Sequence, residues 1–386
     1  MPPSNGNGNG NGNGERVILQ ISSMVPPSRF GGAERVVKAF AEELEVAGFT
    51  VHNQGLRPRS ARSEPGLPIA NVFWPFDGTR RGVIERAVWH AVDVGTLASY
   101  RQVDALVDRY KPDVLVTHNL RGWGFAPWKV ARKRGIPLIH VVHDYGLLCS
   151  SSTMWHGEKE CGIDCRLRSR AARRRWPGGY VVGVSSAVLQ PHLKRVFDAS
   201  DTVTDVVYPL DAAHASDTIS TPIAGPPRVL GYLGRVTADK GIDLLVDAVA
   251  HTDIQLVVAG DGDAREVADL KSRSCANVTW RGWSEPAELF KEVDALVVPS
   301  VWNEPFGLVV AEAAAAGVPV LLADRPGLVE AAEVSGARHA TFHAGNISDL
   351  KRAIAMPLSN YSSLSACYAR GGFTDILTKV LGVMHQ

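Results

Sequence analysis

The segment ALVVPSVWNEPFGLVVAEAAAAGVPVLLAD, residues 295–324, has the pattern of a strand, a helix and a second strand. Residues 295–300 form a short apolar run, which is typical of a buried strand. Residues 308–317 are rich in alanine and end at a glycine, as a helix does, and residues 318–324 are again short and apolar. Short apolar strands that alternate with helices predict a parallel sheet with helices on its faces.

The same alternation extends on both sides of this segment and forms two series. One series lies before residues 211–227, which are rich in Ala, Ser, Thr and Pro and favour a linker, and the other lies after them. We therefore predict an α/β protein of two Rossmann-like domains that face a cleft. The expected boundaries are a disordered Asn/Gly tail at 1–14, a first domain at 15–212, a second domain at 226–370 and a final helix at 371–386.

Composition excludes several classes of protein. The chain has 386 residues, and 45% of them are hydrophobic. Its net charge is +1, so its overall charge does not indicate nucleic-acid binding. No apolar run reaches the roughly 18 residues of a membrane span, and the start lacks the pattern of a signal peptide. We expect a cytoplasmic protein, with contact at the inner face of a membrane as an alternative.

The strongest motif is SVWNEPFGLVVAEAAAAG at residues 300–317. The free N–H groups and the dipole at the start of its helix favour an anion such as a diphosphate. Carboxylates before the helix and two turns along it can accept hydrogen bonds from sugar and ribose hydroxyls. The alternative is an ordinary strand, loop and helix. The residues concerned are Glu304, Phe306, Gly307, Leu308, Val309 and Glu312.

Two further motifs follow strands of the second series. In YLGRVTADKG, residues 232–241, Arg235 and Lys240 are donors suited to a diphosphate leaving group, although surface cations are an equal alternative. In VVAGDG, residues 257–262, Gly260 and Gly262 form a glycine turn, which alone is a weak signal.

Two motifs in the first domain also follow strands. Gly31 and Gly32 allow the backbone to approach a ligand, but they are not the GxGxxG fingerprint of nicotinamide binding. His143, followed by Asp144, lies at the end of a strand, where it can donate a hydrogen bond to a sugar or a phosphate. A structural loop histidine is the alternative.

These motifs, with Gly234–Arg235, Lys240–Gly241 and Glu304-x7-Glu312, occur in an order that resembles the family 4 (group 1) retaining glycosyltransferases of the GT-B fold. The resemblance covers nearly the whole chain after the tail. It implies that residues 15–212 bind an acceptor, that residues 226–370 bind a nucleotide-sugar donor, and that the helix at 371–386 packs back on the first domain.

The resemblance also implies roles for single residues. The expected catalytic residues are His143, Glu304, Arg235 and Lys240. The expected donor-binding residues are Gly31, Gly32, Gly234, Gly260, Gly262, Arg281, Gly282, Phe306, Gly307, Leu308, Val309 and Glu312, with the base near residues 280–282. No metal and no cofactor are expected, because Arg235 and Lys240 would neutralise the diphosphate.

The implied reaction moves a hexose from a UDP- or GDP-sugar to a hydroxyl and retains the anomeric configuration. A glycan, a lipid-linked acceptor or a small-molecule glycoside would supply that hydroxyl. Two alternatives stay open, namely an inactive sugar-nucleotide-binding protein and a GT-B-type sugar-nucleotide epimerase.

A cysteine-containing loop follows His143. Cys149, Cys161 and Cys165, together with His156, could bind zinc or form a disulfide. Their cysteine spacings of twelve and four are not those of a common zinc site, so reduced structural thiols are the expectation.

Six arginines lie between Arg166 and Arg175 in the same loop region. A solvated helix face is the first interpretation. The alternative is a basic surface for an anionic acceptor or for an anionic membrane.

Overall fold

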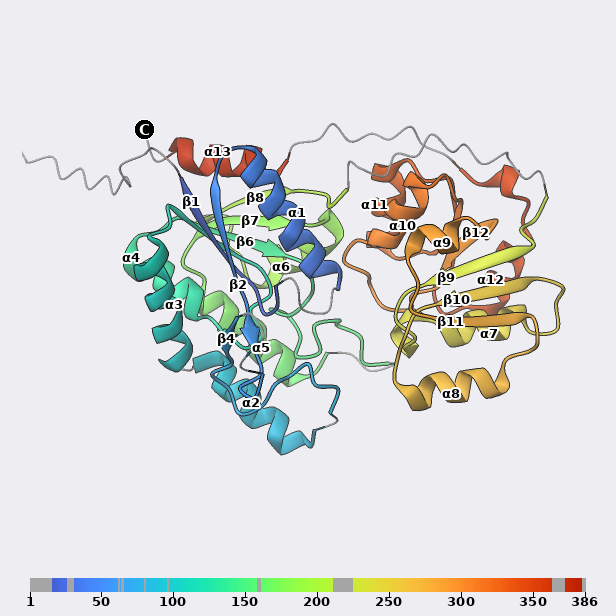
Figure 1. Cartoon of the computed structure of the whole chain (residues 1–386), viewed down its shortest axis with the longest axis horizontal. Helices are drawn as coiled ribbons and strands as arrows, with labels where there is room; N and C mark the ends of the chain where they lie inside the picture. Colours follow the sequence, from blue (N-terminus) through green and yellow to red (C-terminus); the bar gives the residue numbers. More distant parts are fainter. Residues whose placement is uncertain are drawn as a thin grey trace, which may run out of the picture.

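The computed structural model describes residues 16–25, 31–61, 63, 66–79, 81–95, 97–157, 161–210, 225–362 and 372–383. Two six-stranded parallel sheets dominate this part of the chain, and a two-stranded pair joins β3 (Leu56–Arg57) to β4 (Leu67–Pro68). Each large sheet belongs to one of two lobes that lie beside each other (Figure 1). The predicted α/β fold with two Rossmann-like domains is confirmed. The Asn/Gly tail at 1–14 and most of the expected linker, 211–224, lie outside the described residues.

The first sheet has the strand order β2-β1-β5-β6-β7-β8. Its strands are β1 (Val17–Ile21), β2 (Thr50–Gln54), β5 (Val114–Thr117), β6 (Leu138–Val142), β7 (Gly179–Gly183) and β8 (Thr202–Val206). The helices of this domain are α1 (Gly32–Val46), α2 (Val83–Gly95), α3 (Leu97–Tyr110), α4 (Ala126–Arg134), α5 (Ile163–Arg175) and α6 (Ser186–Arg195). Every residue of β1, β5 and β6 is buried, which explains why these strands are mostly apolar in sequence.

The second sheet has the strand order β11-β10-β9-β12-β13-β14. Its strands are β9 (Val229–Leu233), β10 (Gln255–Ala259), β11 (Val278–Gly282), β12 (Ala295–Val298), β13 (Val320–Ala323) and β14 (His339–Phe342). The helices are α7 (Ile242–Val249), α8 (Ala264–Arg273), α9 (Pro286–Phe290), α10 (Leu308–Ala315), α11 (Pro326–Ser335) and α12 (Ile347–Ile354), with short 3-10 turns η2 (Ala238–Lys240) and η3 (Leu358–Asn360).

The strand orders place ligand sites at one point in each sheet. Chain order reverses between β1 and β5 in the first sheet and between β9 and β12 in the second. Ligands of open α/β sheets bind beyond the carboxyl ends of the strands at such a reversal, because neighbouring loops there run in opposite directions and leave a crevice. The loops after these four strands carry Gly31, His118, Lys240 and Glu304.

The last helix, α13 (Phe373–Val383), packs on the first domain, although it follows the second domain in sequence (Figure 1). The rings of Phe373 and Phe40 stack with centroids 4.2 Å apart. The backbone N–H of Thr374 donates to Glu43 Oε1 at 2.8 Å, and Lys379 pairs with Asp205 at 3.2 Å. The end of the chain therefore ties the second domain to α1 of the first.

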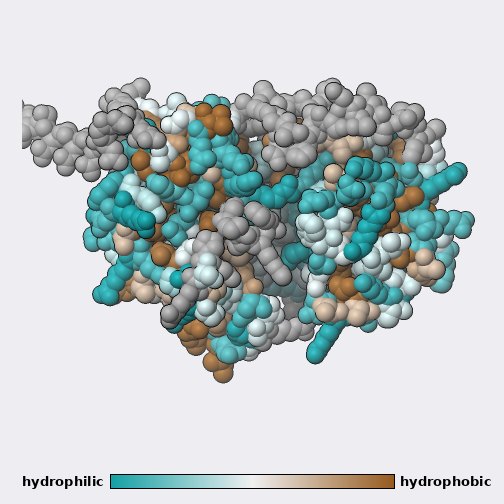
Figure 2. All heavy atoms as spheres, in the orientation of Figure 1, coloured by the Kyte–Doolittle hydropathy of each residue, from teal (hydrophilic) through white to brown (hydrophobic). Residues whose placement is uncertain are grey.

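Among the described residues, no helix has both the length and the apolar character that crossing a bilayer requires. The surface is recessed between the two lobes, and hydrophilic residues prevail along the visible edges of that recess (Figure 2). Several contacts cross between the domains at this place, and they define the candidate site.

Candidate active site

A buried ion pair joins the two loops at the reversal point of the second sheet. Lys240 is the last residue of η2, which follows β9, and Glu304 lies in the loop after β12. Lys240 Nζ donates to Glu304 Oε1 at 2.5 Å, and Ser300 Oγ donates to the same oxygen at 2.7 Å. The side chains of Lys240 and Glu304 are only 19% and 9% exposed. Since an unpaired buried charge is unfavourable, each partner holds the other in place.

Arg235 lies on the same loop as Lys240 but in a different environment. Its side chain is 65% exposed, and its guanidinium is 3.5 Å from Asp239 Oδ2. Lys240 Nζ, by contrast, lies over the ring of Trp302 at 5.1 Å from the centroid. Lys240 is thus a fixed cation, whereas the guanidinium of Arg235 can turn toward an anion at little energetic cost.

The start of α10 faces this ion pair. Gly307 precedes the helix with a φ of 102°, and a Cβ there would lie 2.6 Å from Leu328 Cδ2. A larger residue would be both strained and crowded, so the turn requires glycine. The backbone N–H groups of Leu308 and Val309 lie in the first turn of α10, where a helix offers them no hydrogen-bond acceptor of its own. The positive end of the helix dipole lies at the same place. Phe306 is buried beside them.

The glycines of the neighbouring loops allow two backbones to lie side by side. Gly234 and Gly260 have φ values of 154° and 151°, and a Cβ on Gly260 would lie 1.7 Å from the carbonyl oxygen of Gly234. A Cβ on Gly262 would lie 2.2 Å from the carbonyl oxygen of Val236. The structure therefore gives these glycines a packing role between the loops after β9 and β10.

The residues expected near the base lie at the end of β11. Gly282 accepts a hydrogen bond from the N–H of Gly260 at 2.7 Å, so it belongs to the same glycine-rich edge. Arg281 forms an ion pair with Glu292, and its side chain is 29% exposed. The structure thus places Gly282 beside the loop after β10 and Arg281 in a surface ion pair.

The first helix of the first domain meets α10 of the second. A Cβ on Gly32 would lie 3.2 Å from Leu308 Cδ1. Arg35 of α1 forms an ion pair with Glu312 of α10. Gly32 therefore lies against the first residue of α10, and Arg35 contacts Glu312, the carboxylate expected to bind ribose.

A second contact between the domains involves Glu330 of α11. Its carboxylate accepts from the backbone N–H groups of Ser186 and Ala187 at 2.7 and 2.9 Å, and from the hydroxyl of Tyr208 at 2.9 Å. A carboxylate of the second domain thus caps the start of α6 in the first. This contact is favourable because the positive end of the α6 dipole stabilises the negative charge of the carboxylate.

His143 ends a hydrogen-bonded chain in the first domain. Gln20 Nε2 donates to the backbone oxygen of Val37 at 3.4 Å and to Asn53 Oδ1 at 3.0 Å, so Gln20 Oε1 faces His118 Nε2 at 2.7 Å. His118 Nε2 is therefore the donor, and its Nδ1 accepts from His143 Nε2 at 2.7 Å. This assignment leaves His143 Nδ1 unprotonated. From the sequence we expected His143 to donate a hydrogen bond to a ligand. With the protons placed in this way, His143 Nδ1 is instead a hydrogen-bond acceptor.

A pocket lies in front of His143 at the carboxyl ends of β1, β5 and β6. Its polar lining includes Glu34, His118, Arg121, His143, Asp144, Arg168 and His192. Burial raises the pKa values of both Glu34 and Asp144. His192 Nδ1 lies 2.8 Å from the backbone oxygen of Val188, and its Nε2 is buried without a hydrogen-bond partner among the described residues. The pocket thus has carboxyl and imidazole acceptors beside two guanidinium groups.

Tyr145 connects this pocket to the ion pair of the second domain. It follows His143 and Asp144, and its ring meets Trp302 edge-on with centroids 6.4 Å apart. Burial, with Glu304 as the next cause, raises the pKa of Tyr145. Trp302 lies between Tyr145 and Lys240, so the loop after β6 reaches the ion pair of the second domain.

Sequence reasoning did not single out His118, Arg35, His192, Tyr145 or Glu330 as site residues. His118 follows β5 at the reversal point, and the rule that drew attention to His143 applies to it equally. The others come together only because two distant segments of the chain meet.

Two family models together cover most of the chain. Residues 30–204 match the model described as Glycosyltransferase Family 4, and residues 216–371 match the model described as Glycosyl transferases group 1. The chain belongs to glycosyltransferase family 4. This family transfers a sugar from a nucleotide sugar, so the donor of this glycosyltransferase is a nucleotide sugar.

Curated relatives match the chain over most of its length. The glycosyltransferase is 27% identical over 331 residues to an uncharacterized 42.6 kDa protein in the cps region of Klebsiella pneumoniae, covering 82% of this chain and 87% of that protein. It is 26% identical over 325 residues to a D-inositol 3-phosphate glycosyltransferase of Xylanimonas cellulosilytica, covering 74% and 72%.

Solved structures share the fold. Sucrose-phosphate synthase from Thermosynechococcus elongatus has a TM-score of 0.64 at 18% identity and covers 90% of this chain and 92% of its own. The Anabaena protein HepE, in complex with UDP-glucose, has a TM-score of 0.58 at 17% identity and covers 96% and 99%. These likenesses confirm the GT-B fold.

The buried histidines predict that the glycosyltransferase loses stability in mild acid. Burial lowers the pKa of His143 to about 3 and of His192 to about 4, and it lowers the pKa values of His118 and His140 well below their usual range. The unfolded chain takes up protons below about pH 6.5, whereas the folded chain does not, so each such group removes up to about 1.4 kcal/mol of stability per pH unit as the pH falls.

Glu34, Asp93 and Asp144 oppose this trend, because their pKa values are raised and the folded state binds protons first. The histidines of the unfolded chain take up protons between about pH 7 and about pH 5, and the four buried histidines outnumber the three carboxyl groups, so we expect calorimetric Tm to fall over this range. An unchanged or higher Tm at the lower pH would show that the buried histidines are not held neutral by the fold.

Proposed function

We propose that this glycosyltransferase is a retaining hexosyltransferase that moves a hexose from a UDP- or GDP-sugar to a hydroxyl acceptor bound in the first domain. The acceptor would be a glycan, a lipid-linked sugar or a small-molecule glycoside. One observation carries the proposal, namely the buried pair of Lys240 and Glu304, which Trp302 and Tyr145 connect to the neighbourhood of the pocket that contains His143.

The ion pair suggests how the donor would bind. The diphosphate would compete with Glu304 for Lys240, and Arg235 would turn from the surface toward the same phosphates. The N–H groups of Leu308 and Val309 add donors at the helix start. Released from Lys240, the Glu304 carboxylate would accept hydrogen bonds from hydroxyls of the transferred sugar.

Glu312 would bind the ribose diol in this arrangement. Its contact with Arg35 links donor binding to the position of α1, since both residues lie where the two domains meet. Gly31 and Gly32 leave room for a phosphate near the start of α1, because they present no side chain to it.

The acceptor would occupy the pocket in the first domain. His143 Nδ1 and the carboxyl groups of Glu34 and Asp144 are hydrogen-bond acceptors suited to sugar hydroxyls. In the transfer step, the acceptor oxygen bonds to the anomeric carbon while the bond from that carbon to the phosphate oxygen breaks. The hydroxyl proton passes to the departing phosphate oxygen on the same face, which retains the anomeric configuration. Lys240 and Arg235 stabilise the charge that the leaving diphosphate gains, so the donor site needs no metal.

Helix α5 supports contact with an anionic surface. Arg166, Arg170, Arg173, Arg174 and Arg175 are exposed, as are the apolar side chains of Ile163 and Leu167 among them. Arg168 differs from the other arginines, because it turns inward to Asp93 at 3.7 Å. We therefore propose a cytoplasmic protein that can reach an anionic membrane face through the exposed arginines of α5.

The two alternatives predict different chemistry. An inactive binding protein would bind a nucleotide sugar and never release its diphosphate with any acceptor. An epimerase would change the sugar without forming a glycoside. Neither alternative explains why a carboxylate and a lysine are held together at the start of α10.

A thermal-shift screen against UDP-, GDP-, ADP- and dTDP-sugars identifies the donor. A true donor at about 100-fold excess over its Kd should stabilise the folded state by about 2.7 kcal/mol and raise Tm by several degrees. We expect a UDP- or GDP-sugar to give the largest rise, and the matching free diphosphate to give part of it. If none of the four nucleotide sugars shifts Tm, the proposed donor site is wrong.

A further inference from the structure

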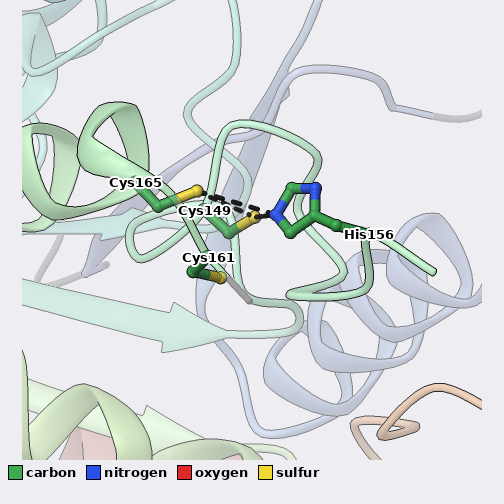
Figure 3. A group of neighbouring side chains, drawn as sticks. All are labelled: Cys149, His156, Cys161 and Cys165. Atoms are coloured by element: carbon green, nitrogen blue, oxygen red, sulfur yellow. Dashed lines mark hydrogen bonds between the residues drawn. The ribbon is translucent and has the colours of Figure 1, made fainter. Parts of the chain in front are cut away.

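Four potential metal ligands converge in the loop that follows the histidine motif. Cys149, His156, Cys161 and Cys165 place one sulfur or imidazole nitrogen each within 4.8 Å of all the others. Their side chains point toward one another, with an imidazole nitrogen of His156 directed at the sulfurs of Cys149 and Cys165 (Figure 3). Cys149 and Cys165 are buried, and His156 and Cys161 are partly exposed.

The distances within this cluster are close to the edges of a tetrahedron around zinc. Zn–S and Zn–N bonds of about 2.3 and 2.0 Å predict ligand-to-ligand edges of roughly 3.5–3.8 Å. The sulfurs of Cys149 and Cys165 lie 3.4 Å apart, and His156 Nε2 lies 3.2 and 3.7 Å from them. A disulfide would require about 2.05 Å between the two sulfurs, so this pair of thiols is not bonded.

We propose that Cys149, His156, Cys161 and Cys165 form a structural zinc site. Three cysteines and one histidine that fill a tetrahedron leave no open position for substrate, as in closed structural sites. The zinc would be separate from the donor site and would take no part in sugar transfer.

The zinc site would fasten a loop that lies beside both the proposed sugar-donor site and the proposed acceptor pocket. The N–H groups of Leu148 and Cys149 donate to the backbone oxygen of Tyr145 at 2.9 and 2.8 Å, and the N–H of Tyr145 donates to the backbone oxygen of Ser152 at 3.1 Å. Cys165 lies in the first turn of α5. Zinc would thus clamp the turn that begins at Tyr145, which packs on Trp302, to the helix that supplies Arg168 to the pocket.

Metal analysis of the whole chain tests this site without any nucleotide sugar. Protein purified with reductant and without chelator should contain about one equivalent of zinc by inductively coupled plasma mass spectrometry. Cys149→Ser and His156→Ala should lose most of it. Cys275→Ser, which changes a cysteine of the second domain, is the matched control and should keep it.

The wild-type chain gives an independent answer if the cysteine variant fails to fold. Cobalt added to the reduced, metal-free protein should give the intense near-ultraviolet charge-transfer band of cobalt thiolate, and native thiol titration should show three cysteines that react only after the metal is removed. Wild-type protein that contains no zinc and gives no such band would overturn the proposal, as would a Cys149–Cys165 disulfide in the purified protein. Because these readouts do not involve transfer, they stand or fall separately from the proposed function.

Discussion

Replacing Lys240 with alanine should lower turnover of the nucleotide sugar by about 10²–10³-fold, because a preorganised donor to a departing charge contributes roughly 3–4 kcal/mol to the barrier. Lys240 is held by Glu304 and lies over Trp302, so its ammonium group is already positioned for a diphosphate that displaces the Glu304 carboxylate. The loss should fall mainly on kcat, since the leaving oxygen gains charge only as the bond breaks. Initial rates of diphosphate release measure it.

A matched variant controls for the loss of a lysine. Lys291→Ala removes an exposed lysine of the same domain that is paired with Glu288 at 2.7 Å, and it should leave turnover unchanged. Lys240→Met keeps the apolar stem over Trp302 and should be as slow as the alanine variant. If Lys240→Ala retains wild-type kcat, Lys240 does not stabilise the leaving group.

Replacing Glu304 with glutamine should separate sugar recognition from diphosphate recognition. The amide oxygen can still accept from Ser300, but the carboxylate charge near the transferred sugar is lost. Hydrogen bonds to a charged group contribute about 1.5–3 kcal/mol, so transfer should fall by about 10- to 100-fold. Binding of the free nucleoside diphosphate should persist or become tighter, because Lys240 no longer has a carboxylate partner.

Calorimetric titration of the free diphosphate and initial rates of transfer give the two readouts for this variant. Glu333→Gln, which changes an exposed glutamate of α11, is the control and should resemble wild type in both. A variant that loses diphosphate binding in parallel with transfer would show that Glu304 supports the whole site and does not read the sugar.

Local sequence patterns predicted the fold well because the central strands of both sheets are short, mostly apolar and buried. The segment at residues 295–324 became β12, α10 and β13, and Gly307 lies at the turn before α10.

Contacts between distant segments could not be predicted in this way. Nothing local to Arg35 indicates that it meets Glu312, 277 positions away, and nothing local to Glu330 indicates that it caps α6. The spacing of Cys149, Cys161 and Cys165 resembles no common zinc motif, yet the turn from Tyr145 to Ser152 and the start of α5 bring them to one point. Spacing rules describe ligands on a regular hairpin or helix, and this loop is neither.

We expect both domains together to transfer a sugar with retention of its anomeric configuration. Proton NMR of the reaction with the donor identified by thermal shift measures that configuration directly, before any spontaneous mutarotation of free sugar. An α-linked donor should give an α-glycoside together with an equal amount of nucleoside diphosphate. A β-glycoside, or a donor that is bound but never converted with any acceptor, would contradict this account.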